Sequence, residues 1–122
     1  MDRKEIAVEY KHNGCNCCQA VLLAFADELP LSREDLLRVG AAFGGGMGCM
    51  EATCGALCGA AMVLGMRTYD GGPISRDAAA LHRAFTEKCG ASLCKDLKGR
   101  DTGVPLCACD DCVRAAAEAL AE

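Results

Sequence analysis

The chain has 122 residues, with 13 basic and 17 acidic side chains and a net charge of −4. This length suits one domain, so we expect residues 1–122 to form a single helical, cysteine-rich unit. The charge balance argues against a nucleic-acid-binding protein, which usually carries a basic surplus. The apolar runs are far shorter than the roughly 20 residues needed to cross a bilayer, so no membrane span is expected.

The composition predicts an all-α fold. The chain contains 21 alanines and 13 leucines, which favour helices, but only 12 valine, isoleucine and threonine residues in total. Glycine-rich segments separate the helix-forming stretches. We therefore expect a small bundle of five or six helices with glycine-rich turns.

In chain order, the expected helical segments are residues 3–11, 17–29, 32–43, 51–64, 75–90 and 110–121, with a short turn around residues 94–98. Pro30 should stop the second helix, and Gly90 should end the fifth. Ser32, Thr53 and Ser75 are the predicted N-caps of the third, fourth and fifth helices. The third helix should end at a loop, residues 44–48, in which four of five residues are glycine.

The unusual feature of the sequence is its 11 cysteines. In a secreted chain, such a density indicates a disulfide scaffold. However, the first ten residues are charged and contain no apolar signal-peptide segment, which predicts a cytoplasmic protein. In a reducing compartment, this many thiols indicate metal ligation or redox chemistry.

The cysteines form four groups near predicted helix ends or glycine turns: Cys15, Cys17 and Cys18; Cys49, Cys54 and Cys58; Cys89 and Cys94; Cys107, Cys109 and Cys112. The dipole and free N–H groups at a helix N-terminus favour the thiolate. The thiolate is the form that binds metals and attacks disulfides. Some cysteines should simply be small buried side chains, and Cys58 and Cys89 are the candidates.

Two Cys-x-x-Cys pairs occur, at residues 15–18 and 109–112. A thioredoxin-like pair would follow a strand, and no strand is predicted. The two pairs also lie too far apart in the chain for a compact zinc motif.

Several segments carry a more specific pattern: Asn16-Cys17-x-Gln19-Ala20, Phe43-Gly44-Gly45-Gly46-Met47-Gly48, Thr53-Cys54-Gly55-Ala56-x-x-Gly59-Ala60, Cys94-Lys95-Asp96-Leu97 and Cys109. Together they resemble the C-GCAxxG-C-C family of redox-active proteins. Split-Soret cytochromes c look like relatives of this family and carry haem and an iron–sulfur centre in a helical dimer. The resemblance therefore implies a homodimer. The chain has no Cys-x-x-Cys-His sequence, so covalent haem is not expected.

The resemblance implies that an iron–sulfur cluster is held at converging helix ends by the family's four characteristic cysteines, Cys17, Cys54, Cys94 and Cys109. Cys49 and Cys112 flank two of these and are the predicted additional ligands. Such a protein would act in electron transfer with a redox partner protein, or in other cluster-based redox chemistry. The catalytic residues, if any, are not specified.

Two alternatives remain open at this point. One is a cluster-free thiol–disulfide protein or redox sensor, with Cys54 as the low-pKa thiol near a helix start. The other is a protein that binds zinc or Cu(I), because soft thiolates suit both ions.

Overall fold

The computed structural model describes residues 2–121, whose regular secondary structure is helical. These residues contain seven α-helices, one 3-10 turn and one π-helical turn, more than the five or six helices expected. The helices are α1 (Arg3–His12), α2 (Cys17–Ala24), α3 (Arg33–Gly40), α4 (Gly55–Thr68), α5 (Ser75–Cys89), α6 (Cys94–Lys98) and α7 (Cys109–Ala121). The 3-10 turn is η1 (Ala26–Glu28), and the π-helical turn is η2 (Gly46–Met50). Residues 2–121 form no β-strand, so the predicted all-α class is confirmed.

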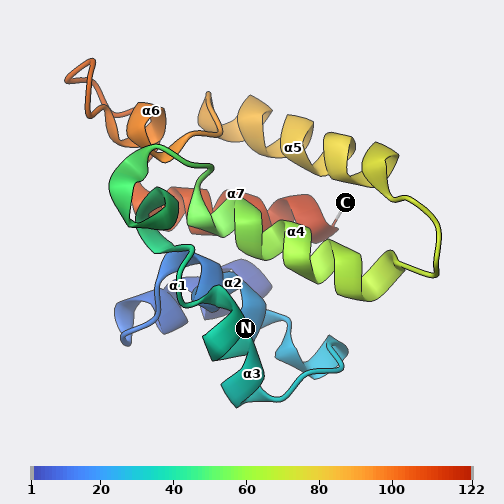
Figure 1. The fold of residues 1–122 in the computed structure, drawn as a ribbon. Coiled ribbons are helices and arrows are strands. Elements are labelled where there is room, and N and C mark those ends of the chain that lie inside the picture. The colour runs from blue at the N-terminus through green and yellow to red at the C-terminus, as the bar shows by residue number, and fades with distance from the viewer. Residues whose placement is uncertain (1, 122) are drawn as a thin grey trace.

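Helices α4 and α7 run side by side through the middle of the bundle (Figure 1). Helix α5 packs along one side of this pair, and α1 and α2 pack along the other. Helix α3 contacts α2, and α6 lies at the end of the bundle where α7 begins. No described helix is long and apolar enough to cross a membrane.

Local signals in the sequence explain several helix ends. The Ser32 hydroxyl accepts a hydrogen bond from the Asp35 N–H at 3.1 Å, so its predicted N-cap role is confirmed. Gly90 ends α5 with a φ of +93°, also as predicted. Asn16 and Gln19 form a capping box that starts α2 at Cys17.

Other predicted boundaries are wrong, each for a tertiary reason. Cys54, not Thr53, is the N-cap of α4, because Thr53 pairs with Leu93 in an isolated β-bridge. Helix α2 ends at Ala24, whose carbonyl accepts a 2.6 Å hydrogen bond from Arg3 instead of continuing the helical ladder.

Three further boundaries differ from the prediction. Helix α3 stops at Gly40 and excludes Phe43, and α4 continues beyond Leu64 to Thr68. Ser75 already lies inside α5, with Ile74 before it as the N-cap.

Helices α2 and α4 touch through their backbones. A Cβ atom at Gly59 would lie 2.7 Å from the carbonyl oxygen of Cys18 in α2. One at Gly55 would lie 3.4 Å from the Cys18 nitrogen and 2.7 Å from the carbonyl oxygen of Phe43, which follows α3. Only glycine allows this approach, because real Cβ atoms essentially never come so close to another heavy atom. The start of α4, and Cys54 with it, is therefore held against the start of α2.

Replacing Gly59 by alanine should lower the free energy of unfolding by about 1–3 kcal/mol, because the new methyl group forces α2 and α4 apart. Gly65→Ala is the matched control, since no atom lies within 4 Å of a Cβ at that position of the same helix. The control should be neutral or stabilising by up to about 1 kcal/mol through helix propensity. Denaturant titration of both variants measures the difference, and equal effects would contradict the proposed close contact.

Candidate functional site

Four helices begin at one end of the bundle, and each begins at or directly after a cysteine. This is the end where α6 and the start of α7 lie, on the left of Figure 1. The cysteines are Cys17 in α2, Cys54 before α4, Cys94 in α6 and Cys109 in α7. These four, with Cys107, Cys112 and Lys98, line a single cavity. The structure thus brings together the four cysteines that the sequence singled out.

A short backbone pairing holds Cys54 next to Cys94. The Cys54 N–H donates to the Ser92 carbonyl at 2.7 Å, and the Cys94 N–H donates to the Ala52 carbonyl at 3.0 Å. These bonds flank the Thr53–Leu93 bridge. They tie two segments that are 40 positions apart in the sequence, so the relative placement of the two thiols is set by the backbone.

The glycine-rich loop packs against Cys94. Gly46 has a φ of +60°, and a Cβ atom there would lie only 2.6 Å from the Cys94 Cβ. Both the left-handed backbone and the lack of space require glycine at this position. The loop therefore forms a close-fitting wall beside the thiol.

Cys54 is the buried thiol of the site whose pKa is lowered. A hydrogen bond from the Cys112 thiol, the N–H groups of Ala56 and Leu57, and the nearby Lys98 lower its pKa from 9.0 to about 6, against the opposing effect of burial. The two N–H groups belong to the first turn of α4, where they have no helical partner. Cys54 is thus a thiolate near neutral pH.

The surrounding thiols show the opposite behaviour. Burial raises the pKa of Cys17 to about 11 and also raises that of Cys94. The hydrogen bond to Cys54 raises the pKa of Cys112, because it uses the Cys112 proton. Burial opposes the charge of Lys98, but its hydrogen bond to Cys109 raises its pKa overall. The cavity therefore combines the Cys54 thiolate and one ammonium group with three thiols whose raised pKa values keep them protonated: Cys17, Cys94 and Cys112.

Three thiols, two of which also line this cavity, form a compact group. The sulfur atoms of Cys89, Cys107 and Cys112 all lie within 4.8 Å of one another. Cys89 and Cys112 are buried and Cys107 is half-buried. Cys107 was not among the predicted ligands, and Cys89 was expected to be only a packing residue. Cys89 and Cys107 belong to this group because the end of α5 packs against α7, and no local sequence signal indicates that packing.

The remaining cysteines lie outside the cavity. Cys49 is exposed, and its thiol donates to the Gly46 carbonyl at 3.5 Å. Cys18 is buried against the Met62 sulfur at 3.9 Å, and the Cys58 thiol donates to the Thr53 carbonyl at 3.9 Å. Cys15 is half-buried against the core. Of the two predicted additional ligands, the fold brings Cys112 to the cavity and leaves Cys49 outside.

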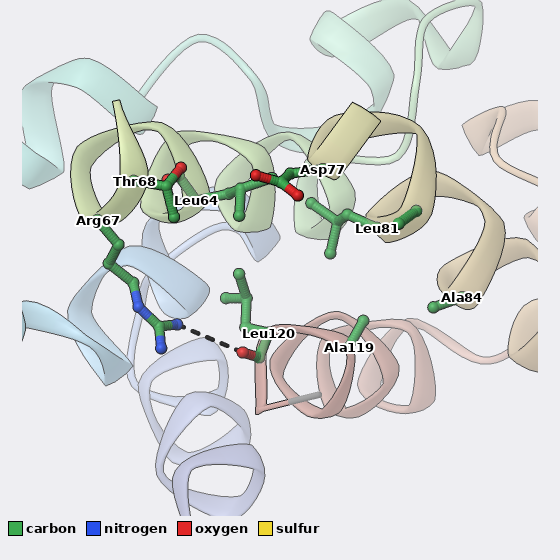
Figure 2. Close-up of a pocket in the computed structure, with 9 residues that line it drawn as sticks. Leu64, Arg67, Thr68, Asp77, Leu81, Ala84, Ala119 and Leu120 are labelled. Atoms are coloured by element: carbon green, nitrogen blue, oxygen red, sulfur yellow. Dashed lines mark hydrogen bonds between the residues drawn. The ribbon is translucent and has the colours of Figure 1, made fainter. Parts of the chain in front are cut away.

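A second pocket lies at the opposite end of the bundle, between the end of α4, the start of α5 and the end of α7. Figure 2 shows Arg67 reaching across it to the Leu120 carbonyl, at 3.4 Å, with Leu81 and Ala84 on the facing helix. Its described lining residues include no cysteine or histidine. The thiol chemistry is therefore concentrated at the α6 end.

Residues 15–122 match the family described as "Putative redox-active protein (C_GCAxxG_C_C)". No curated protein and no solved structure matches the chain. The matched segment contains all 11 cysteines and every residue that lines the cavity.

In metal-free protein, thiolate absorbance should titrate with a midpoint near pH 6, and Cys54→Ala should remove this step. Cys112→Ala should move the midpoint upward, because it deletes the hydrogen bond with the largest effect on Cys54. The pKa of Cys54 is lower in the folded chain than the unfolded value of 9.0, so its thiolate stabilises the fold above pH 9 and this contribution disappears as the pH falls through 6. A midpoint that stays near 9 would contradict the proposed environment.

Proposed function

We propose a function for this chain, a member of the C_GCAxxG_C_C family. The proposal is based on the thiols that the fold brings together. It binds an iron–sulfur cluster through Cys17, Cys54, Cys94 and Cys109 and acts as a redox protein. The observation that supports this best is that these four thiols, from four helix starts, line one cavity. Four cysteine thiolates are the usual ligand set of such a cluster.

The donor set of the cavity fits a thiolate-bound inorganic group. Apart from Lys98, its described lining residues are cysteines, glycines and Leu97, with no carboxylate or imidazole. The space between the side chains is about 10 Å³, close to one water molecule. An organic substrate does not fit there. A cluster is also larger than this space, so loading requires the side chains that line it to move apart.

The chain's own groups would balance the negative charge of four thiolates. Lys98 already donates to Cys109, and the first N–H groups of α4 point to Cys54. When bound, the cluster would supply one-electron chemistry, and such neighbouring charges and hydrogen bonds tune its reduction potential. Leu97 and the surrounding buried side chains limit access of water to the thiols.

Cys112 and Cys49 remain the proposed additional ligands, with unequal support. Cys112 lines the cavity and hydrogen-bonds to Cys54, whereas Cys49 is exposed outside it. The cytoplasmic location, the homodimer and a redox partner protein also remain proposals, based on the sequence and the family resemblance.

A second candidate function rests on the placement of Cys54, whose pKa is lowered, and Cys112 in the same cavity. If the cavity opened enough to admit a disulfide of a partner, the Cys54 thiolate would attack it, forming a mixed disulfide and releasing one partner sulfur as a thiolate. The Cys112 thiol, after losing its proton, would attack the Cys54 sulfur and release the second partner sulfur. The partner disulfide is thereby reduced by two electrons, and Cys54 and Cys112 are oxidised to a disulfide.

Anaerobic reconstitution with iron and sulfide should give a coloured protein, and single alanine variants of Cys17, Cys54, Cys94 and Cys109 should each lose most of the visible absorption. Each variant removes one thiolate ligand. Cys58→Ala is the matched control, because this half-buried thiol lies on α4 but outside the cavity. The readout is the spectrum together with iron and sulfide counts per chain.

The same experiment separates the two candidate functions. A colourless, iron-free protein after reconstitution would overturn the cluster proposal. If that protein then reduced a disulfide substrate, and Cys54→Ala or Cys112→Ala abolished the reaction, the thiol–disulfide function would replace it.

A further inference from the structure

The group formed by Cys89, Cys107 and Cys112 has a geometry of its own. These residues come from the end of α5, the loop after α6 and the first turn of α7. All three sulfur–sulfur distances are 4.8 Å or less. Three sulfurs at about 2.3 Å from one metal ion are separated by about 4 Å. The three thiols are therefore within a small side-chain movement of a shared ion.

We propose that Cys89, Cys107 and Cys112 form a second site that binds one thiophilic metal ion, Zn²⁺ or Cu⁺, and that uses none of the four main cysteines proposed for the cluster. Soft thiolates select both ions. Entry of one Zn²⁺ displaces three protons from three thiols and leaves a net charge of −1, whereas Cu⁺ leaves −2. Because a buried charge is costly, the divalent ion fits this site better.

The surroundings of the three thiols favour the binding of a cation. Cys89 and Cys112 are each 3% exposed, so water cannot solvate their thiolates. Burial raises the pKa of Cys89 to about 12. Without an ion, the group contains weak contacts, such as the one between the Cys112 sulfur and the Cys107 carbonyl, which are 3.8 Å apart. A bound cation would replace these weak contacts with three strong bonds.

The position of the site gives it a structural consequence. The loop after α6 returns to Leu97, whose carbonyl accepts from the N–H groups of Leu106 and Cys107 at 2.9 and 3.2 Å. A metal ion on Cys107 would fasten this loop to both α5 and α7. Cys109 lies two residues further on, so the ion would also hold one wall of the first cavity.

The test is made on the full-length Cys17→Ser/Cys94→Ser double variant, which removes two thiols of the first cavity and none of the three. Zn²⁺ and, separately, Cu⁺ are titrated anaerobically against a chromophoric chelator in the presence of a non-thiol reductant. We expect one ion per chain. Adding Cys89→Ala should weaken the affinity for this ion at least about 100-fold. The loss of a residue that only supports a metal ligand usually lowers the affinity less than that. Adding Cys58→Ala, the matched control, should leave the affinity unchanged.

Metal-dependent thermal stabilisation gives a second readout, because an ion that binds the folded chain raises its melting temperature. This shift should disappear in the Cys107→Ser variant, whose half-buried loop position tolerates the change better than Cys89. Binding of Cu⁺ but not Zn²⁺ would support the site and identify Cu⁺ as its ion. Absence of binding by either ion, or full affinity in both the Cys89 and Cys107 variants, would overturn the proposal. Because no iron is used, this result is independent of the success or failure of the cluster proposal.

Discussion

The close contact between α2 and α4 is the constraint on which the rest of the structure depends. At Gly59, α4 lies directly on the backbone of α2, and any side chain would separate the helices. This contact brings the N-terminal ends of the two helices together, and with them Cys17 and Cys54. The β-bridge next to Cys54 then adds Cys94, and α7 packs against α4 to add Cys109.

The electrostatic consequence of this packing is that thiols are concentrated where water is scarce. Burial favours the protonated form for most of them, as at Cys17 and Cys94. Cys54 is the exception, because helix N–H groups, Lys98 and the Cys112 thiol all stabilise its negative charge. One thiolate among protonated thiols is a suitable starting point for metal binding, since an incoming cation meets a ready ligand and then displaces the remaining protons.

Cys112 connects the two proposed sites. Its thiol hydrogen-bonds to Cys54 in the first cavity, while its sulfur lies within 4.8 Å of Cys89 and Cys107. An ion bound to Cys112 would remove the proton that now stabilises the Cys54 thiolate. The occupancy of one site should therefore influence the acidity of the other through this single side chain.

Much of the fold could be predicted from local patterns. The all-α class follows from the alanine and leucine content, and the Ser32 cap and the Gly90 terminator follow from backbone chemistry that depends only on neighbouring residues. The failures have tertiary causes. Thr53 does not cap α4 because Leu93, distant in the chain, pairs with it. Helix α2 ends early because Arg3 takes the carbonyl of Ala24.

The sequence by itself determined that this is a helical, cysteine-rich chain of a redox family, and it pointed to four cysteines at helix starts. Motifs and helix caps are short-range features, so they can be read along the chain. Only the tertiary structure decided which thiols face each other. It placed Cys112 between two groups of sulfurs, left Cys49 at the surface and joined Cys89 to Cys107. Those relations depend on how α4, α5 and α7 pack, and packing distances between remote segments are not encoded in any local pattern.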